Sequence, residues 1–128
     1  APTPIDLTIA LDDDPIETTT TESGVVIETF AQGEGDPSTS GDRLRVVFRA
    51  MLADGTVFRS SEQMNTPMTI PLEDGRAVPG LLDGLLGMRP GTERRIRVPW
   101  LQGYGENGRP PVPGRTDLVF DVRVLSVN

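Results

Sequence analysis

The chain has 128 residues, enough for one domain with a single hydrophobic core. It contains no Cys and no His, which excludes a disulfide framework and argues against a zinc site or a His-based nucleophile relay. No apolar run approaches the roughly 18 residues of a membrane span. We therefore expect no metal, no cofactor and no membrane-spanning segment.

The charge is distributed unevenly along the chain. The net charge is −7, yet residues 1–41 hold nine acidic and no basic residues, and the remainder has a small positive excess. All twelve basic residues are arginines and they are scattered, so no nucleic-acid partner is predicted.

The first residue is Ala rather than Met, which fits either a processed export product or a trimmed chain. Together with the acidic N-terminal segment this favours export, and both the exported and the cytoplasmic compartment stay open.

Residues 1–23 differ in pattern from the rest of the chain. Apolar residues alternate from Ile5 to Leu11, which is typical of a short edge strand. Asp12–Pro15 and the Thr18–Thr21 run then predict a flexible linker. Two interpretations stay open: a disordered tether, or a strand that pairs with the domain's own edge or with a neighbour's, giving self-association through residues 5–11. We place an N-terminal extension at residues 1–23 and a folded domain at residues 24–128.

From Gly24 onward, alternating apolar residues predict a series of strands. Val25, Ile27 and Thr29 share one side of the first strand. In the next strand Leu44, Val46, Phe48 and Ala50 alternate with Arg43, Arg45, Val47 and Arg49, which predicts a half-buried strand whose arginines face water. Ala53–Thr56 forms a tight turn. Further strands are predicted near residues 57–58, 68–72, 92–100 and 118–127. The long loop at 101–117 has a length typical of functional or disordered segments.

Residues 78–88 are the only stretch with helical spacing of apolar residues, at Leu81, Leu82, Leu85, Leu86 and Met88. Pro79 suits a first helical position. Gly84 and Gly87 each weaken the helix by roughly 1 kcal/mol, so it needs a sheet to support it. Strands do not alternate with helices, which favours an α+β fold with an antiparallel sheet.

Several short motifs occur in one order along the chain. They are Ala53–Phe58 (ADGTVF), Ser60-Ser61, Val78–Gly80 (VPG), Gly84, Met88, Gly91, Gly103–Gly105 (GYG) and Leu118–Val122 (LVFDV). In this order they resemble the FKBP-type peptidyl-prolyl cis-trans isomerases, from about residue 24 to the C-terminus. The resemblance implies a highly twisted antiparallel sheet wrapped around one short helix. It also implies an isomerase, or rotamase, that acts as a folding helper and chaperone on proline-containing, unfolded or flexible protein segments.

The same resemblance implies a site between helix and sheet that receives a proline ring. Its catalytic positions would be Tyr104, Phe58 and Phe120. Its substrate-binding positions would be Phe48, Arg59, Met68, Ala77, Val78, Leu81 and Val112. Tyr104 would direct its hydroxyl at a substrate carbonyl, and Ala77 and Val78 would present backbone groups. For the apolar members, packing in the core is the alternative role; Trp100 is predicted to cover the core edge, and Arg109 to be a solvated loop charge.

Three positions depart from the family pattern. Leu81 replaces the usual Trp floor, Arg59 replaces an Asp, and Phe48 replaces the Tyr that bonds that Asp. Because both partners of that polar contact are absent together, no buried polar group is left without a partner. Arg59 either places a cation at the pocket mouth or extends into solvent. These departures predict slow but measurable catalysis, and they leave a non-catalytic FKBP-like binding module as the alternative function.

Overall fold

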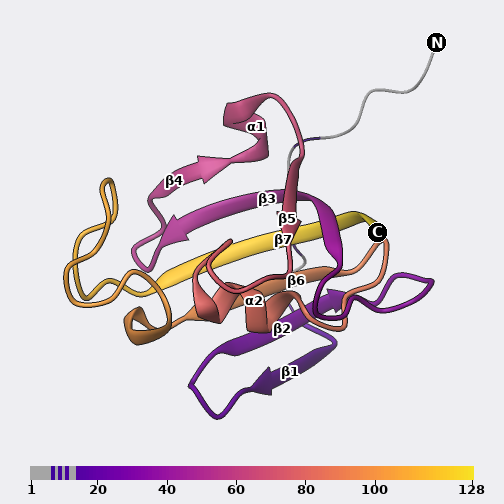
Figure 1. Cartoon of the computed structure of the whole chain (residues 1–128), viewed down its shortest axis with the longest axis horizontal. Coiled ribbons are helices and arrows are strands. Elements are labelled where there is room, and N and C mark those ends of the chain that lie inside the picture. The colour runs from indigo at the N-terminus through magenta and orange to yellow at the C-terminus, as the bar shows by residue number, and fades with distance from the viewer. Residues whose placement is uncertain (1–6, 8, 10, 12–13) are drawn as a thin grey trace.

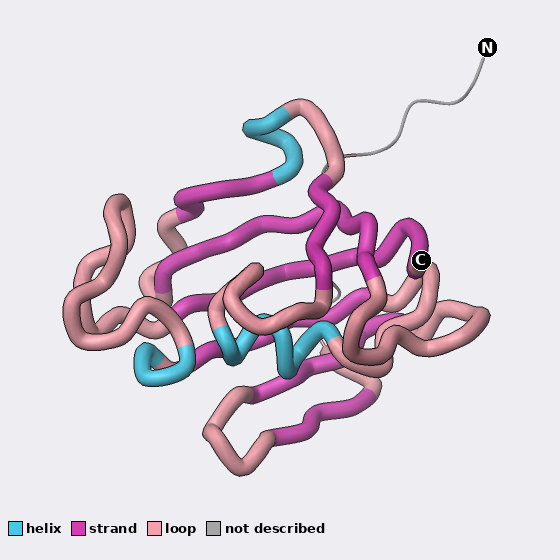
Figure 2. Tube along the Cα trace, in the orientation of Figure 1, coloured by secondary structure: helices cyan, strands magenta, loops and turns pink. Residues whose placement is uncertain are grey.

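The computed structural model describes residues 7, 9, 11 and 14–128, and its main element is an antiparallel sheet of seven strands. The strands are β1 (Glu17–Thr20), β2 (Val26–Ala31), β3 (Arg43–Leu52), β4 (Val57–Ser60), β5 (Met68–Pro71), β6 (Glu93–Val98) and β7 (Leu118–Val127). The helices are α1 (Ser61–Met64), α2 (Pro79–Leu85) and a 3₁₀ turn, η1 (Trp100–Gln102). Figure 2 shows how little of the chain is helical.

The strands follow the order β1-β2-β6-β7-β3-β4, and β5 pairs with the first part of β3. The long strands β3 and β7 lie at the centre, with Ala50 opposite Phe120 and Phe48 opposite Val122. Helix α2 lies across one face of the sheet (Figure 1). The predicted α+β fold, a twisted antiparallel sheet around a short helix, is confirmed.

Close packing between α2 and β6 depends on two glycines. A Cβ atom on Gly84 would lie 2.6 Å from the nearest side-chain atom of Ile96, and one on Gly80 would lie 2.5 Å from Val98. Both distances are shorter than real Cβ contacts, so only Gly lets the helix approach the sheet this closely. Close packing against Ile96 thus compensates for the helix propensity that Gly84 lacks. Leu86 leaves the predicted apolar stripe and is 43% exposed.

The sheet face opposite α2 is also partly buried, contrary to the expectation for β3. Val47 is 0% exposed although its side chain alternates away from the helix side. Asp121 on the same face is also 0% exposed and accepts hydrogen bonds from Arg95 Nε at 2.8 Å and Arg49 Nη2 at 3.1 Å. The hydrogen bond to Asp121 raises the pKa of Arg95. Alternation alone did not predict the burial of Val47. Of the arginines predicted to face water, Arg43 and Arg45 are exposed, whereas Arg49 is half-buried in an ion pair with Asp121.

The N-terminal extension contributes to the fold. Glu17–Thr20 is strand β1, paired with β2, so the interpretation of Thr18–Thr21 as a flexible linker is wrong. In the predicted strand at 5–11, the described residues Leu7, Ile9 and Leu11 are not in a strand, and the others lie outside the described part of the chain. The Leu7 carbonyl accepts a hydrogen bond from Ser61 Oγ at 2.8 Å. Ile9 is 5% exposed, so this segment docks on its own domain.

Two other segments differ in detail from the sequence prediction. The strand predicted at 92–100 ends at Val98, and Trp100 begins η1, where its N–H donates to Asp117 Oδ1 at 2.9 Å. The polar segment after β4 forms the single turn α1, which Ser60 caps by accepting from Gln63 N at 3.1 Å. Within residues 7, 9, 11 and 14–128, no helix is long and apolar enough to cross a membrane.

Candidate active site

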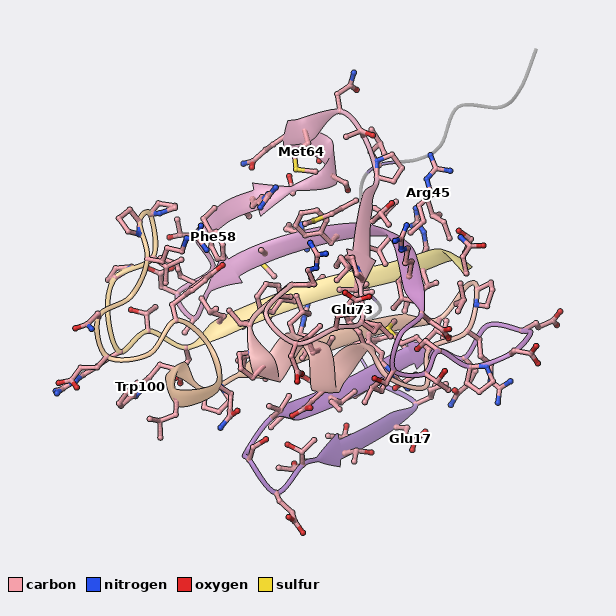
Figure 3. All side chains as sticks on the ribbon, in the orientation of Figure 1. Glu17, Arg45, Phe58, Met64, Glu73 and Trp100 are labelled. Carbon is pink, nitrogen blue, oxygen red and sulfur yellow. The ribbon has the colours of Figure 1, made fainter. Side chains whose placement is uncertain are left out.

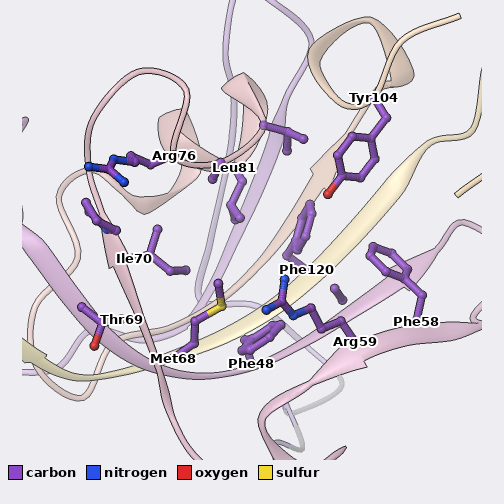
Figure 4. Close-up of a pocket in the computed structure, with 14 residues that line it drawn as sticks. Phe48, Phe58, Arg59, Met68, Thr69, Ile70, Arg76, Leu81, Tyr104 and Phe120 are labelled. Carbon is purple, nitrogen blue, oxygen red and sulfur yellow. The ribbon is translucent and has the colours of Figure 1, made fainter. Parts of the chain in front are cut away.

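A pocket of about 120 Å³ opens between the first turn of α2, strands β3–β5 and β7, and the loop after η1 (Figure 4). Its walls are predominantly apolar. The lining residues are Phe48, Ala50, Phe58, Arg59, Met68, Thr69, Ile70, Pro71, Arg76, Ala77, Val78, Leu81, Tyr104 and Phe120. An apolar concave site with few polar groups is the usual form of a small-molecule or side-chain binding pocket.

Aromatic rings from three strands form the walls of this pocket. Phe48 in β3 and Phe120 in β7 lie on the helix-facing side of their strands and are 5% and 6% exposed. Ala50, opposite Phe120 in the register, leaves room between the rings because its side chain is a single methyl group. Phe58 in β4 is half-buried and completes the wall toward the loop that carries Tyr104.

Leu81 and the residues before it form the base of the pocket. Leu81 lies in the first turn of α2, where its N–H donates to the Val78 carbonyl at 3.0 Å, and it is 7% exposed. Pro79 occupies the start of the helix, as the sequence predicts. The Val78 N–H donates to no described group. This segment therefore offers the pocket an unused backbone donor beside an aliphatic floor.

Tyr104 supplies a polar group directed into the pocket. Its ring follows η1, and its hydroxyl points inward toward Phe120 (Figure 4). The loop is fixed on either side, because Gly105 N donates to the Trp100 carbonyl and Arg115 N donates to the Gly105 carbonyl, both at 2.9 Å. Gly105 has φ +72°, a conformation that favours glycine. Among the described residues, no group hydrogen-bonds the hydroxyl, which leaves it available to a ligand.

The predicted site residues come together almost completely. Nine line the pocket: Phe48, Phe58, Arg59, Met68, Ala77, Val78, Leu81, Tyr104 and Phe120. Val112 is 4% exposed and lines an adjoining cavity together with Phe58, Arg59 and Tyr104. The prediction omitted Ala50, Thr69, Ile70, Pro71 and Arg76. Alternation with Phe48 could have identified Ala50, and alternation with Met68 could have identified Ile70, whereas no pattern marks Arg76.

A family model described as FKBP-type peptidyl-prolyl cis-trans isomerase matches residues 35–125. The chain belongs to this family. It is similar to peptidyl-prolyl cis-trans isomerase FKBP15-1 of Arabidopsis thaliana, with 43% identity over 89 residues, 69% of this chain and 58% of that protein. The FKBP fold is also found in FkpA from Escherichia coli, a crystal structure with a TM-score of 0.81 and 31% identity, covering 87% of this chain and 51% of that one.

A third similarity concerns the fold alone. The N-terminal domain of FKBP42 from Arabidopsis thaliana has a TM-score of 0.81 at 20% identity, covering 93% of this chain and 98% of that domain. This FKBP domain therefore has the usual fold of its family. The chain spans only 58% of FKBP15-1 and 51% of FkpA.

Proposed function

We propose that this FKBP domain is a peptidyl-prolyl cis-trans isomerase that accelerates rotation about X–Pro bonds in flexible or unfolded protein clients. The observation that carries the proposal is an apolar pocket into which the Tyr104 hydroxyl points, with no hydrogen-bond partner among the described residues. The family membership and the named isomerases among its relatives support the same reaction. The chain's Tyr104, Phe58 and Phe120 are the proposed catalytic residues.

Rotation about an X–Pro bond needs little from the protein except a suitable environment. The barrier is about 18–20 kcal/mol, because amide resonance keeps the bond planar. A planar amide has a larger dipole than the twisted transition state. Transfer from water to an apolar pocket therefore destabilises the ground state more than it destabilises the transition state. The proline ring would pack between Phe48, Phe58 and Phe120 above Leu81. Each tenfold gain in rate requires about 1.4 kcal/mol of binding that favours the transition state.

Tyr104 and Val78 would orient the substrate within this environment. The Tyr104 hydroxyl can donate to a substrate carbonyl, and the Val78 N–H can donate to another at the opposite side of the pocket base. Two fixed donors would hold the peptide on either side of the bond and favour a part-rotated form. No step forms a covalent intermediate. The aliphatic floor at Leu81 gives the ring less contact area than a large aromatic floor, so we expect slow catalysis.

The test is the cis-to-trans relaxation of an Ala-Leu-Pro-Phe peptide, followed with and without the protein. We expect the relaxation rate to rise in proportion to protein concentration. An unchanged rate at micromolar protein would contradict the enzymatic function.

A non-catalytic binding module is the second candidate, favoured by Leu81 at the floor and by Arg59 at the pocket rim. In that case proline peptides would bind with chemical-shift changes around Tyr104 while their relaxation rate stayed unchanged.

Self-association through residues 5–11 stays a prediction. Sedimentation of the full chain over a range of concentrations tests it, and the docking of Leu7 and Ile9 on their own domain favours a monomer.

A further inference from the structure

Arg59 places an uncompensated positive charge at the rim of the proline pocket. Its side chain is exposed, and in Figure 4 its guanidinium extends over the pocket between Phe48 and Phe120. Among the residues that the structure describes, its Nε donates only to the sulfur of Met64 at 3.5 Å, which is a weak acceptor. No carboxylate among the described residues pairs with it. The terminal nitrogens of this guanidinium are therefore free to bind an anionic group.

A second arginine faces the same side of the site. Arg109 lines the cavity that adjoins the pocket, together with Arg59, Phe58, Tyr104 and Val112. Its position is defined by a tight turn, because Arg109 N donates to the Val112 carbonyl at 3.0 Å and Val112 N donates to the Arg109 carbonyl at 2.7 Å. Arg109 is exposed, and no described acidic residue pairs with it. Two arginines without an acidic partner in the described part of the chain thus flank the wall that holds Tyr104.

The two cavities contain no acidic side chain among the residues that line them. The third arginine of the rim, Arg76, differs because its Nε lies 3.5 Å from Glu73 Oε2. The chain as a whole carries a net charge of −7, so this local excess of positive charge is opposite in sign to the whole molecule. We therefore expect the arginines at the site to select ligands through direct contact with them, and not through the electrostatic field of the whole molecule, which has the opposite sign.

We propose that the site selects X–Pro segments that carry a carboxylate on a residue next to the proline, with Arg59 and Arg109 as the specificity-determining residues. The inference rests on the proposed isomerase function and names its substrate class. A proline ring in the pocket brings both neighbouring residues of the substrate to the rim. An aspartate or glutamate there meets a guanidinium that can bind both of its oxygens, whereas a basic residue meets a like charge.

The test compares kcat/KM for capped Ala-X-Pro-Phe peptides in which X is Glu, Gln or Arg. A second pair, Ala-Leu-Pro-Glu and Ala-Leu-Pro-Gln, covers the other side of the proline. Glu and Gln have the same shape, so their ratio isolates charge. We expect the Glu peptide to exceed its Gln partner about two- to fivefold in at least one series, the range of an exposed ion pair. The ratio should fall toward one between about 0.02 M and about 0.5 M salt.

The protein variants assign this preference to the two arginines. The double change Arg59→Gln and Arg109→Gln should reduce the ratio of kcat/KM for the Glu peptide to that for the Gln peptide to about one. Arg45→Gln is the matched control, because Arg45 is exposed and lines neither cavity. Figure 3 shows it well apart from Phe58 in the pocket wall. The control removes the same charge and should keep the preference.

Three results would overturn the proposal, and they differ in what else they exclude. Acceleration of all peptides with equal kcat/KM for Glu and Gln at low salt would overturn the acidic specificity alone. A Glu preference that survives in the double variant would overturn the assignment to Arg59 and Arg109. Acceleration of no peptide would overturn the isomerase function and this inference with it.

Discussion

Tyr104 is the residue whose role can be separated most cleanly from folding. Its hydroxyl points into the pocket and bonds to no described group, while its ring packs against the buried hydrophobic core that includes Leu81 and Phe120. Tyr104→Phe keeps the ring and removes only the donor. We expect kcat/KM for X–Pro relaxation to fall about three- to tenfold, the value of one hydrogen bond made by the substrate. Thermal unfolding should stay unchanged; undiminished kcat/KM would remove Tyr104 from the proposed site.

Individual residues also mark the limit of sequence reasoning. Phe48, Phe58, Leu81 and Phe120 could be placed in the site from ordered motifs, because family members share their spacing. The burial of Asp121 could not be predicted, since an Asp in an alternating strand normally faces water. It is buried because Arg49 and Arg95 on the neighbouring strands β3 and β6 supply charged donors across the sheet. Ion pairs between strands depend on which strands are neighbours in the sheet, and the alternation within a single strand does not predict that order.

At the scale of elements, α2 is short and contains two glycines, so its position depends on contact with the sheet. The change Gly84→Ala raises helix propensity by about 1 kcal/mol but places a methyl group against Ile96. Three Ile96 side-chain atoms lie 2.6–2.8 Å from that position, so helix or strand must shift. We expect a net loss of about 1–3 kcal/mol in the free energy of unfolding, measured by urea denaturation.

The control for this prediction is Asp83→Ala, the neighbouring exposed position of the same helix. It adds the same residue without a close contact, and we expect unchanged or slightly higher stability. A stabilising effect of Gly84→Ala would contradict the packing role of this glycine.

The sequence predicted the helix itself because its apolar spacing is local. It did not predict α1 or β1, since α1 is a single capped turn and β1 is four exposed residues held only by pairing with β2.

For the molecule as a whole, the open question is whether the domain begins at residue 24. The boundary at residue 24 rested on a change in composition, and it stays a prediction. Strand β1 already extends the sheet before that point, and Ile16 N donates to the Thr29 carbonyl at 2.8 Å. Leu7 binds Ser61 at the start of α1, beside the opposite edge of the sheet. Ile9 lies between Leu7 and Ile16 in the sequence and is buried. It is not part of the hydrophobic core that packs against α2.

These contacts predict that residues 7–14 stabilise the domain without forming its site. Deleting residues 1–14 removes the burial of Ile9 and the shorter of the two hydrogen bonds that Ser61 Oγ donates, the one to Leu7 at 2.8 Å rather than to Phe48 at 3.3 Å. We expect the free energy of unfolding to fall by roughly 2–3 kcal/mol. Deleting only residues 1–6 keeps both contacts and serves as the control. Because neither Leu7 nor Ile9 lines the pocket, the truncated protein should still accelerate X–Pro relaxation below its melting temperature. Equal stability of the two truncated chains would instead support a domain that begins after this segment.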